Sequence, residues 1–454
     1  MKSITIGQSQ YYQFYQKVLE RHIHDSLYSY LVQHGLLLNS QSGFRRFHSC
    51  ETTLLNISEY MLQNIDQGNM CGAVMLDLRK AFDLVNHDIL IHKLSKYGIS
   101  DNSCKWFHSY LTNRYQVVSY NGHLSEPLPI KSGVPQGSIL GPLLFILFVN
   151  DFILEIHDTQ LDIYADDSTN YVAAKSVTEI NDKLNAQLVP ISNWIDDNKM
   201  VLNVDKSEAM LFGTKCIMRK SRNQLCIGIN DTKLKSVDTH KLLGIHLDNH
   251  LTWNIHIDKL CNKVKSRLFL FRKIKYLLPL QARMQFFEGY VQPLLDYGCI
   301  IWGNTSRHNL KRLHTVVKQF GRSILDIKKP KDIRTVDLFK TLDWLPIDTR
   351  IRYFKGVMAY KAINNLTPVY LSQMFTLTQQ VHQYQTRQST NKDIYMPNIK
   401  TEYGRRSYKY WATIEWNMLP HFVKDSPSLP VFKKRYMLYL KTNIYVAGNF
   451  PIDA

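Results

Sequence analysis

Four common features are missing from this sequence of 454 residues. Its seven cysteines are scattered without a Cys-x-x-Cys pair, so we expect neither a zinc site nor a disulfide framework, and a reducing compartment fits best. The longest apolar run, Leu140–Val149, contains Gly141 and Pro142 and is too short to cross a bilayer, which indicates a buried helix. The N-terminus is polar and rich in tyrosine, and neither a signal peptide nor an internal repeat is evident. These absences disfavour secreted, membrane-spanning and repeat proteins.

Acidic residues are scarce in the second half of the chain. Residues 251–454 carry 33 Lys and Arg against 13 Asp and Glu, whereas residues 1–250 carry 23 against 25. The whole net charge of +18 therefore arises after residue 250. Such an excess either keeps the surface soluble or forms a basic surface that follows phosphates. A chain of this length is expected to divide into about two to four domains.

Two adjacent carboxylates, Asp166 and Asp167, follow Tyr164 and Ala165 at a bend between apolar, β-prone flanks. Two like charges held side by side lower stability unless a divalent cation neutralises them. Taken alone, the pair is equally well explained as a solvated turn, because aspartate favours turns.

A second acidic position changes that balance. The short apolar run at 71–76 predicts a strand with Asp77 at its end, and the apolar residues after it recur at helical spacing as far as Gly98, a C-terminal cap. Two strands lying side by side would bring Asp77 and Asp166 to one edge of a sheet. Three carboxylates there would hold two Mg²⁺ ions about 4 Å apart, the arrangement used for phosphoryl transfer.

These residues, in their order along the chain, resemble the reverse transcriptases of non-LTR (LINE-type) retrotransposons, particularly the jockey-like branch. The resemblance runs from about Tyr15 to the C-terminal end, and its ordered blocks argue strongly against chance agreement. The blocks are 41–49, similar to the fingers block; 76–90, 132–144 and 164–167, similar to the first three palm motifs; Trp194, Asn198, Leu202, Asn203 and Lys206, similar to the fourth; and 242–248, similar to the primer grip.

The resemblance implies an α+β fold of the right-hand polymerase type, with fingers, a βαββαβ palm, a helical thumb and a small, mostly helical C-terminal region. The expected divisions are partial fingers in 1–68, the palm with the remaining fingers elements in 69–250, the thumb and helical connection in 251–375, a glutamine-rich linker in 376–393, and a basic, aromatic subdomain in 394–454.

The activity that the resemblance implies is RNA-directed DNA polymerisation, in which dNTPs extend a DNA primer 3′-hydroxyl on an RNA template. Asp77 and Asp166 would be the main ligands of two Mg²⁺ ions, with Mn²⁺ as the alternative metal. Asp167 would be a less direct carboxylate ligand, and the Leu78 carbonyl an additional one. The protein would act inside the cell, in the nucleus and cytoplasm, without a membrane; its protein partners are left open.

Four further residues match family positions around the nucleotide. Phe82 matches the steric gate, an aromatic ring that would clash with a 2′-hydroxyl and so favour dNTPs, although its spacing also fits a core residue. Gln136, followed by Gly137 in a loop where the backbone can approach a nucleotide closely, resembles a residue that contacts the incoming dNTP. Lys206 resembles a lysine proposed to stabilise the leaving pyrophosphate, and a solvated surface lysine is the alternative.

Basic residues of the fingers and of one predicted helix complete the expected contacts with nucleic acid. Arg45 and Arg46 in the fingers would contact the template or the triphosphate. The predicted helix would pack with an apolar face formed by residues 268–271 and hold the primer–template duplex with its basic face. The basic residues of that helix are Lys263, Lys265, Arg267, Arg272, Lys273 and Lys275.

The chain also departs from the family pattern in two places. An Arg-Pro-Ile-Ser-like segment of the fingers is replaced by residues 1–10, and Phe47 stands where the family usually has glycine. A truncated element, reduced to a catalytically impaired relic that still binds nucleic acid, is therefore the first alternative. A maturase-like splicing factor is the second alternative, and the jockey-like C-terminal block argues against it.

Overall fold

The chain folds into two compact units in the computed structural model. The structure describes residues 2–4, 10–221, 224–230, 232–381 and 392–445. The first unit consists of Met1–Cys50, Cys71–Leu211 and Ser221–Val237; the second consists of Glu51–Met70, Phe212–Lys220 and Asp238–Ala454.

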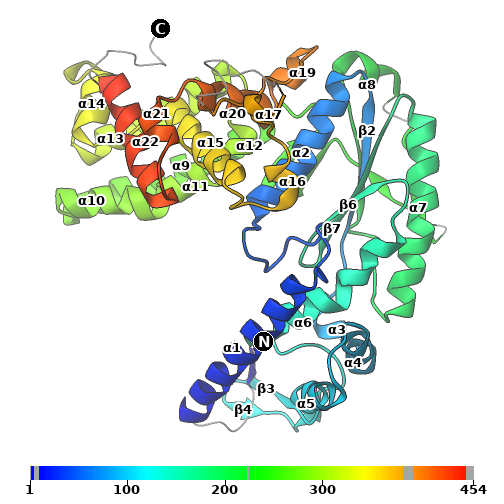
Figure 1. Cartoon of the computed structure of the whole chain (residues 1–454). Coiled ribbons are helices and arrows are strands. Elements are labelled where there is room, and N and C mark those ends of the chain that lie inside the picture. Colours follow the sequence, from blue (N-terminus) through cyan, green and yellow to red (C-terminus); the bar gives the residue numbers. More distant parts are fainter. Residues whose placement is uncertain (1, 5–9, 222–223, 231, 382–391, 446–454) are drawn as a thin grey trace. The chain divides into compact units, whose positions relative to one another are not determined.

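The first unit is built on a mixed five-stranded sheet with the strand order β11-β8-β2-β7-β6 (Figure 1). Along the chain the order β2, α6, β6, β7, α7, β8 is the βαββαβ arrangement expected of the palm, and that prediction is confirmed. These elements are β2 (Met70–Leu76), α6 (Leu140–Val149), β6 (Gln160–Tyr164), β7 (Asp167–Ala174), α7 (Val177–Asp197), β8 (Glu208–Phe212) and β11 (Lys235–Ser236).

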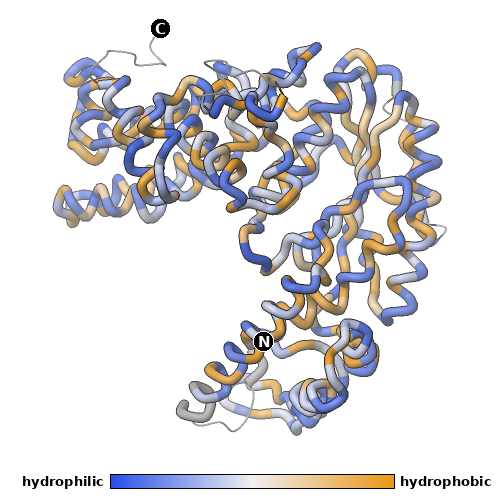
Figure 2. Tube along the Cα trace, in the orientation of Figure 1, coloured by the Kyte–Doolittle hydropathy of each residue, from blue (hydrophilic) through white to orange (hydrophobic). Residues whose placement is uncertain are grey.

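Strand β2 and helix α6 are buried because their sequences are apolar throughout, as Figure 2 shows by the orange colour of the sheet and of α6. The interrupted apolar run of α6 is therefore a buried helix, as predicted. Gly72 lets α7 lie directly against β2, since a Cβ atom at residue 72 would come within 2.3 Å of Ile180. The lack of one side chain thus sets the distance between the sheet and the helix that covers it.

The rest of the first unit surrounds this sheet. Helices α4 and α5 pack against each other, and α1 and α4 both contact α6. Strand β3 pairs in antiparallel fashion with β1, β4 and β5, and β9 pairs with β10. The elements are β1 (Lys2–Ile4), α1 (Gln10–Gln33), α3 (Ala81–Leu84), α4 (His87–Lys96), α5 (Asp101–Leu111), β3 (Tyr115–Tyr120), β4 (His123–Leu124), β5 (Leu128–Pro129), η1 (Asn150–Glu155), β9 (Gly228–Ile229) and β10 (Thr232–Lys233).

The second unit is mostly helical, as expected for a helical thumb and for the C-terminal region. It also contains the antiparallel hairpin β12–β13. Its elements are α2 (Cys50–Asp66), α8 (Lys215–Ser221), β12 (Thr239–Leu242), β13 (Ile245–Asp248), α9 (Asn254–Ile274), η2 (Lys275–Leu277), α10 (Leu280–Phe286), η3 (Phe287–Val291), α11 (Gln292–Asp296), α12 (Cys299–Trp302), α13 (Arg307–Ile324), η4 (Pro330–Asp332), α14 (Thr335–Thr341), α15 (Ile347–Ile363), α16 (Val369–Ser372), α17 (Thr378–Val381), α19 (Glu402–Arg405), α20 (Tyr408–Asn417), α21 (His421–Lys424) and α22 (Leu429–Tyr445).

Aromatic side chains form two cores in the second unit. Phe287 stacks on Trp344 with ring centres 3.9 Å apart between α9, α13 and their neighbours, and Tyr360 stacks on Phe432 at 4.4 Å where α15, α20 and α22 meet. Rings of this size each remove a large apolar area from water, and close ring pairs add to that stabilisation.

Two expectations are refined by this unit. Helix α9 buries Leu268 and Phe271, but Phe269 and Leu270 are 63% and 44% exposed, so the apolar face predicted at 268–271 is wrong for those two residues. An α-helix rotates by about 100° per residue, so four consecutive residues point in all directions around it and cannot share one face. Of the expected linker 376–393, residues 382–391 lie outside the described part, and Leu377 near its start pairs in antiparallel fashion with Ile394, the residue after its end.

No helix in the described part of the chain is both long and apolar enough to span a bilayer.

Candidate active site

The two adjacent carboxylates lie at the tip of the hairpin formed by β6 and β7. Tyr164 pairs with Asp167, which leaves Ala165 and Asp166 as the two residues of the turn. Ala165 has a φ of +58°, a left-handed conformation that tight hairpin turns require. Asp166 is half-buried and Asp167 is exposed. The bend predicted from the sequence is therefore a strand-to-strand turn that presents both carboxylates.

The side chain of Gln41 holds this turn by hydrogen bonds, a role that the sequence did not predict. Its fully buried side chain accepts the backbone N–H of Gly43 (2.7 Å) and of Ala165 (3.2 Å), and its Nε2 donates to the Ala165 carbonyl at 3.4 Å. Residue 41 also pairs in parallel with Ile163. A Cβ atom on Gly43 would lie 2.5 Å from the Ala165 nitrogen, so only glycine fits there. The fingers block thus holds the turn that carries Asp166.

Asp77 directly follows β2, the neighbour of β7 in the sheet, and β7 begins with Asp167. Its carboxylate accepts a hydrogen bond from the Asn203 amide (2.8 Å), and its carbonyl accepts the Asn203 backbone N–H (2.7 Å). Ser207 accepts the Asp77 N–H at 3.2 Å and donates to the Asn203 carbonyl. The fourth motif therefore holds the end of the first by neutral hydrogen bonds.

The carboxylates supply hard oxygen donors of the kind that Mg²⁺ prefers, so the donor chemistry fits a divalent cation. Within the described residues, however, no three His, Cys, Asp or Glu side chains are close enough together to hold a metal ion. The Leu78 backbone, the other expected ligand, pairs with Leu202 in an antiparallel bridge. The side chains are thus of the right type at the ends of neighbouring strands, and Asp77 is turned toward Asn203.

Phe82 stands between the two roles considered for it. Its ring is half-buried and stacks on the buried Phe145 of α6, with centres 4.1 Å apart, so the core supports it. Phe44 contacts its edge at a centre-to-centre distance of 6.2 Å. A half-buried ring held by a rigid helix has one side in the core and another that a ligand can reach.

The second palm motif is bound to the segment that carries Phe82. Val134 donates its N–H to the Phe82 carbonyl (3.0 Å), and the exposed Gln136 donates to the Asp83 carboxylate (2.8 Å). Gly133 has a φ of +88°, and a Cβ atom there would lie 2.8 Å from the Asp83 carbonyl oxygen. Gly137, with φ +82°, faces open space. The structure thus brings the first two palm motifs together.

Two titratable side chains of these motifs, one buried and one half-buried, keep their neutral forms. Burial lowers the pKa of His87, whose Nε2 lies 2.9 Å from the Gly133 carbonyl. Burial also raises the pKa of Tyr164, at the base of the carboxylate turn, to about 12. Neither side chain therefore adds a charge next to the carboxylates near neutral pH.

The remaining predicted residues lie apart from the carboxylates or have other partners. Lys206 has an exposed side chain and donates its backbone N–H to the Asn203 carbonyl. Arg45 turns inward, and its guanidinium donates to the carbonyls of Leu38 and Gln41 (2.8 Å for Gln41). In this structure Arg45 fixes its own loop, whereas its neighbour Arg46 is exposed.

Comparison with known proteins agrees with this arrangement. The family model described as reverse transcriptase (RNA-dependent DNA polymerase) matches residues 10–247, more than half of the chain. The probable RNA-directed DNA polymerase from transposon BS of Drosophila melanogaster is 28% identical over 353 residues, covering 74% of this chain and 37% of that protein. The RNA-directed DNA polymerase from mobile element jockey of the same species is 26% identical over 341 residues, covering 72% and 36%.

The chain spans a little over a third of the length of these relatives. Among solved structures, the apo telomerase of Candida tropicalis matches with a TM-score of 0.40 and 11% identity, covering 74% of this chain and 56% of that one. From the family match over residues 10–247, and from the named relatives, the chain belongs to the reverse transcriptase family, in its non-LTR retrotransposon branch.

Proposed function

We propose that this chain is an RNA-directed DNA polymerase that extends a DNA primer on an RNA template with dNTPs. One observation carries the proposal: Asp166 and Asp167 lie at the hairpin turn before and at the start of β7, and β7 is the neighbour of β2, which Asp77 directly follows. Carboxylates on adjacent strands of a βαββαβ sheet are suited to phosphoryl transfer.

Asp77, Asp166 and Asp167, with the Leu78 carbonyl, would hold Mg²⁺ or Mn²⁺. The chemistry such ions supply when bound is activation of the primer 3′-hydroxyl and neutralisation of charge on the leaving pyrophosphate. Asn203 orients the Asp77 carboxylate without cancelling its charge, because an amide is a neutral donor. Lys206 would stabilise the leaving group.

Phe82 and Gln136 would select and orient the incoming nucleotide. The Phe82 ring is fixed by its stack on Phe145, so it cannot easily yield to a ribose 2′-hydroxyl, and dNTPs would be favoured. Gln136 is exposed and donates to the surface carboxylate of Asp83, a bond that it can exchange for the nucleotide. Gly137 allows the backbone to approach that nucleotide closely.

The two units would take the parts of a right-hand polymerase, with fingers and palm in the first and thumb and C-terminal subdomain in the second. The basic helix α9 would follow the phosphates of the primer–template duplex through Lys263, Lys265 and Lys273, all of which are exposed. Binding through such contacts weakens steeply with added salt.

Primer extension tests the proposal. Purified wild type should incorporate dNTPs on an RNA template in the presence of Mg²⁺, and Asp166→Asn should reduce the rate by roughly a thousandfold or more, because it removes a charged metal ligand. Asp182→Asn, an exposed aspartate on α7, is the matched control and should retain the wild-type rate. Equal, background-level incorporation by wild type and Asp166→Asn would contradict the proposal and favour the impaired, nucleic-acid-binding relic.

A further inference from the structure

Two phenylalanines in the loop at 43–49 of the first unit have a backbone conformation that aromatic residues rarely adopt. Phe44 has a φ of +53° and Phe47 a φ of +68°, both in the left-handed region that favours glycine. Their side chains are 53% and 44% exposed. Burial in the core therefore cannot be what compensates for the strain at either residue, and strained residues concentrate at functional sites.

The loop is held firmly by its surroundings. The Tyr28 hydroxyl accepts the Arg46 backbone N–H at 3.0 Å, and Nδ1 of His48 lies 2.9 Å from the Arg46 carbonyl. At the start of the loop, Gly43 is bound to Gln41 and packed against the Ala165 turn. The strained conformations are thus imposed by fixed contacts on both sides, which is the condition under which they persist.

The exposed side chains of this loop offer two aromatic rings and a guanidinium next to the candidate active site. The Arg46 guanidinium lies 4.8 Å from the centre of the Phe47 ring, a cation–π arrangement. The Phe44 ring meets the edge of Phe82, the proposed steric gate, at 6.2 Å. One end of the group therefore reaches the place where we propose that the incoming nucleotide binds.

We propose that Phe44, Arg46 and Phe47 form a stacking platform for an unpaired base of the template strand. Aromatic rings and a planar guanidinium stack on the faces of all four bases, whereas they lack the hydrogen-bonding pattern that would select one of them. A polymerase must read every template base in turn, and such a platform suits that requirement. The inference rests on the proposed function and adds to it a site for the template strand.

A double-mutant cycle between protein and nucleic acid tests the platform. Phe47→Gly removes the ring and accepts the left-handed conformation without strain, so the variant should unfold at the same temperature as wild type or higher. The probe is a labelled RNA–DNA duplex with a five-nucleotide RNA 5′ overhang, carrying either normal bases or abasic sites in the overhang. Binding is measured without dNTPs, so that only template bases can occupy the platform.

Wild type should bind the normal overhang about tenfold more tightly than the abasic overhang, and Phe47→Gly should bind both with nearly equal affinity. Phe422→Ala, an exposed phenylalanine of the second unit, should behave as wild type does. Wild-type binding that is indifferent to the overhang bases, or a preference that survives in Phe47→Gly, would overturn the platform but leave the proposed function intact. Failure to bind either duplex would overturn both.

Discussion

The candidate active site and the C-terminal part of the second unit hold their polar side chains by opposite means. Around the site the partners are neutral amides, because Gln41 holds the Ala165 turn, Asn203 holds Asp77 and Gln136 holds Asp83. In the second unit the partners are ions. Its part-buried or buried pairs include Arg350–Asp296, Arg352–Glu415 and Lys424–Asp393.

The kind of partner, an ion or a neutral amide, separates carboxylates that stabilise the fold from carboxylates whose charge remains for a ligand. An ion pair fixes a carboxylate and cancels its charge, whereas an amide fixes it and leaves the charge in place. The second unit has an excess of basic residues, so its few carboxylates are readily paired. The carboxylates of the site keep a negative potential that suits a divalent cation.

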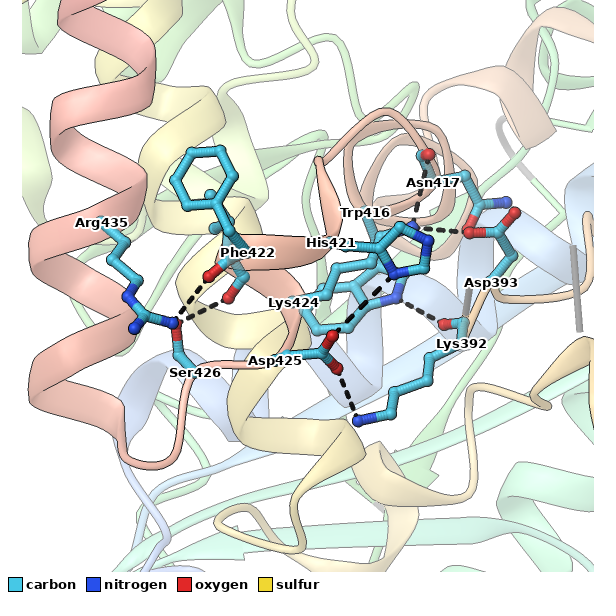
Figure 3. Close-up of polar contacts among 11 residues, drawn as sticks. Lys392, Asp393, Trp416, Asn417, His421, Phe422, Lys424, Asp425, Ser426 and Arg435 are labelled. Atoms are coloured by element: carbon cyan, nitrogen blue, oxygen red, sulfur yellow. Dashed lines mark hydrogen bonds and ion pairs between the residues drawn. The ribbon is translucent and has the colours of Figure 1, made fainter. Parts of the chain in front are cut away.

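Removing one ion from a buried pair should cause the largest loss. Lys424 and Asp393 lie 2.6 Å apart with side chains only 2% and 10% exposed (Figure 3). Lys424→Met would leave the Asp393 carboxylate buried without its cation. We expect the free energy of unfolding to fall by about 3–5 kcal/mol, measured by urea denaturation of the whole chain.

Figure 3 also shows the matched control, the pair Lys392–Asp425, whose ions are 2.7 Å apart but 55% and 50% exposed. Lys392→Met should change the free energy of unfolding by about 1 kcal/mol or less, because solvent screens an exposed pair. Similar losses in the two variants would mean that burial does not set the strength of these pairs, and the contrast between the two regions would weaken.

Glu59 is an exception among the carboxylates of the second unit, because it is buried and bound by backbone N–H groups. It accepts from Tyr408 and Lys409, at 3.1 Å for Lys409. Burial raises the pKa of Glu59 from 4.5 to about 7, so the folded state holds this proton more tightly than the unfolded state. The associated stability is full below pH 4.5 and is lost as the pH rises through 7, by about 3 kcal/mol in all.

The measurement is the difference in free energy of unfolding between wild type and Glu59→Gln at a series of pH values. Between pH 4.5 and pH 8, wild type should lose about 3 kcal/mol of stability relative to Glu59→Gln, because glutamine does not ionise. Glu402→Gln, at an exposed glutamate, should give a difference that is flat with pH. A flat curve for Glu59→Gln would show that the backbone donors keep this carboxylate ionised.

The sequence was a good guide to elements and a poor one to the contacts between them. The turn at Asp166, the strand before Asp77 and the buried helix α6 follow from local pattern, because each depends on neighbours within a few residues. The hydrogen bonds between Gln41 and the carboxylate turn do not follow from local pattern, since Ala165 lies 124 positions from Gln41. The Asn203–Asp77 bond spans 126 positions, and only the order of family motifs hinted at it. The apolar face predicted at 268–271 wrongly included Phe269, because a run of four apolar residues does not show which of them face the core of a helix.

Among the buried residues tested, Gln41 gives the smallest expected change in stability, and it tests directly whether a neutral amide holds the turn that carries Asp166. Gln41→Leu fits the buried space but leaves the N–H groups of Gly43 and Ala165 without their side-chain acceptor, which should lower the free energy of unfolding by about 1–3 kcal/mol. Gln63→Leu, at an exposed glutamine, controls for the change of side chain.

Because Gln41 contacts the turn and not the proposed nucleotide site, Gln41→Leu should reduce kcat in primer extension and leave the KM for dNTPs near the wild-type value. A rise in KM with unchanged kcat would mean that the side chain acts on nucleotide binding instead. Gln41→Glu adds a charge at the same place: it keeps both acceptor bonds, loses the donor to the Ala165 carbonyl and, when ionised, places a buried negative charge beside the turn that carries Asp166. Because burial opposes ionisation of this carboxyl, Gln41→Glu should lose stability as well as activity, and both losses should grow as the pH rises through its ionisation.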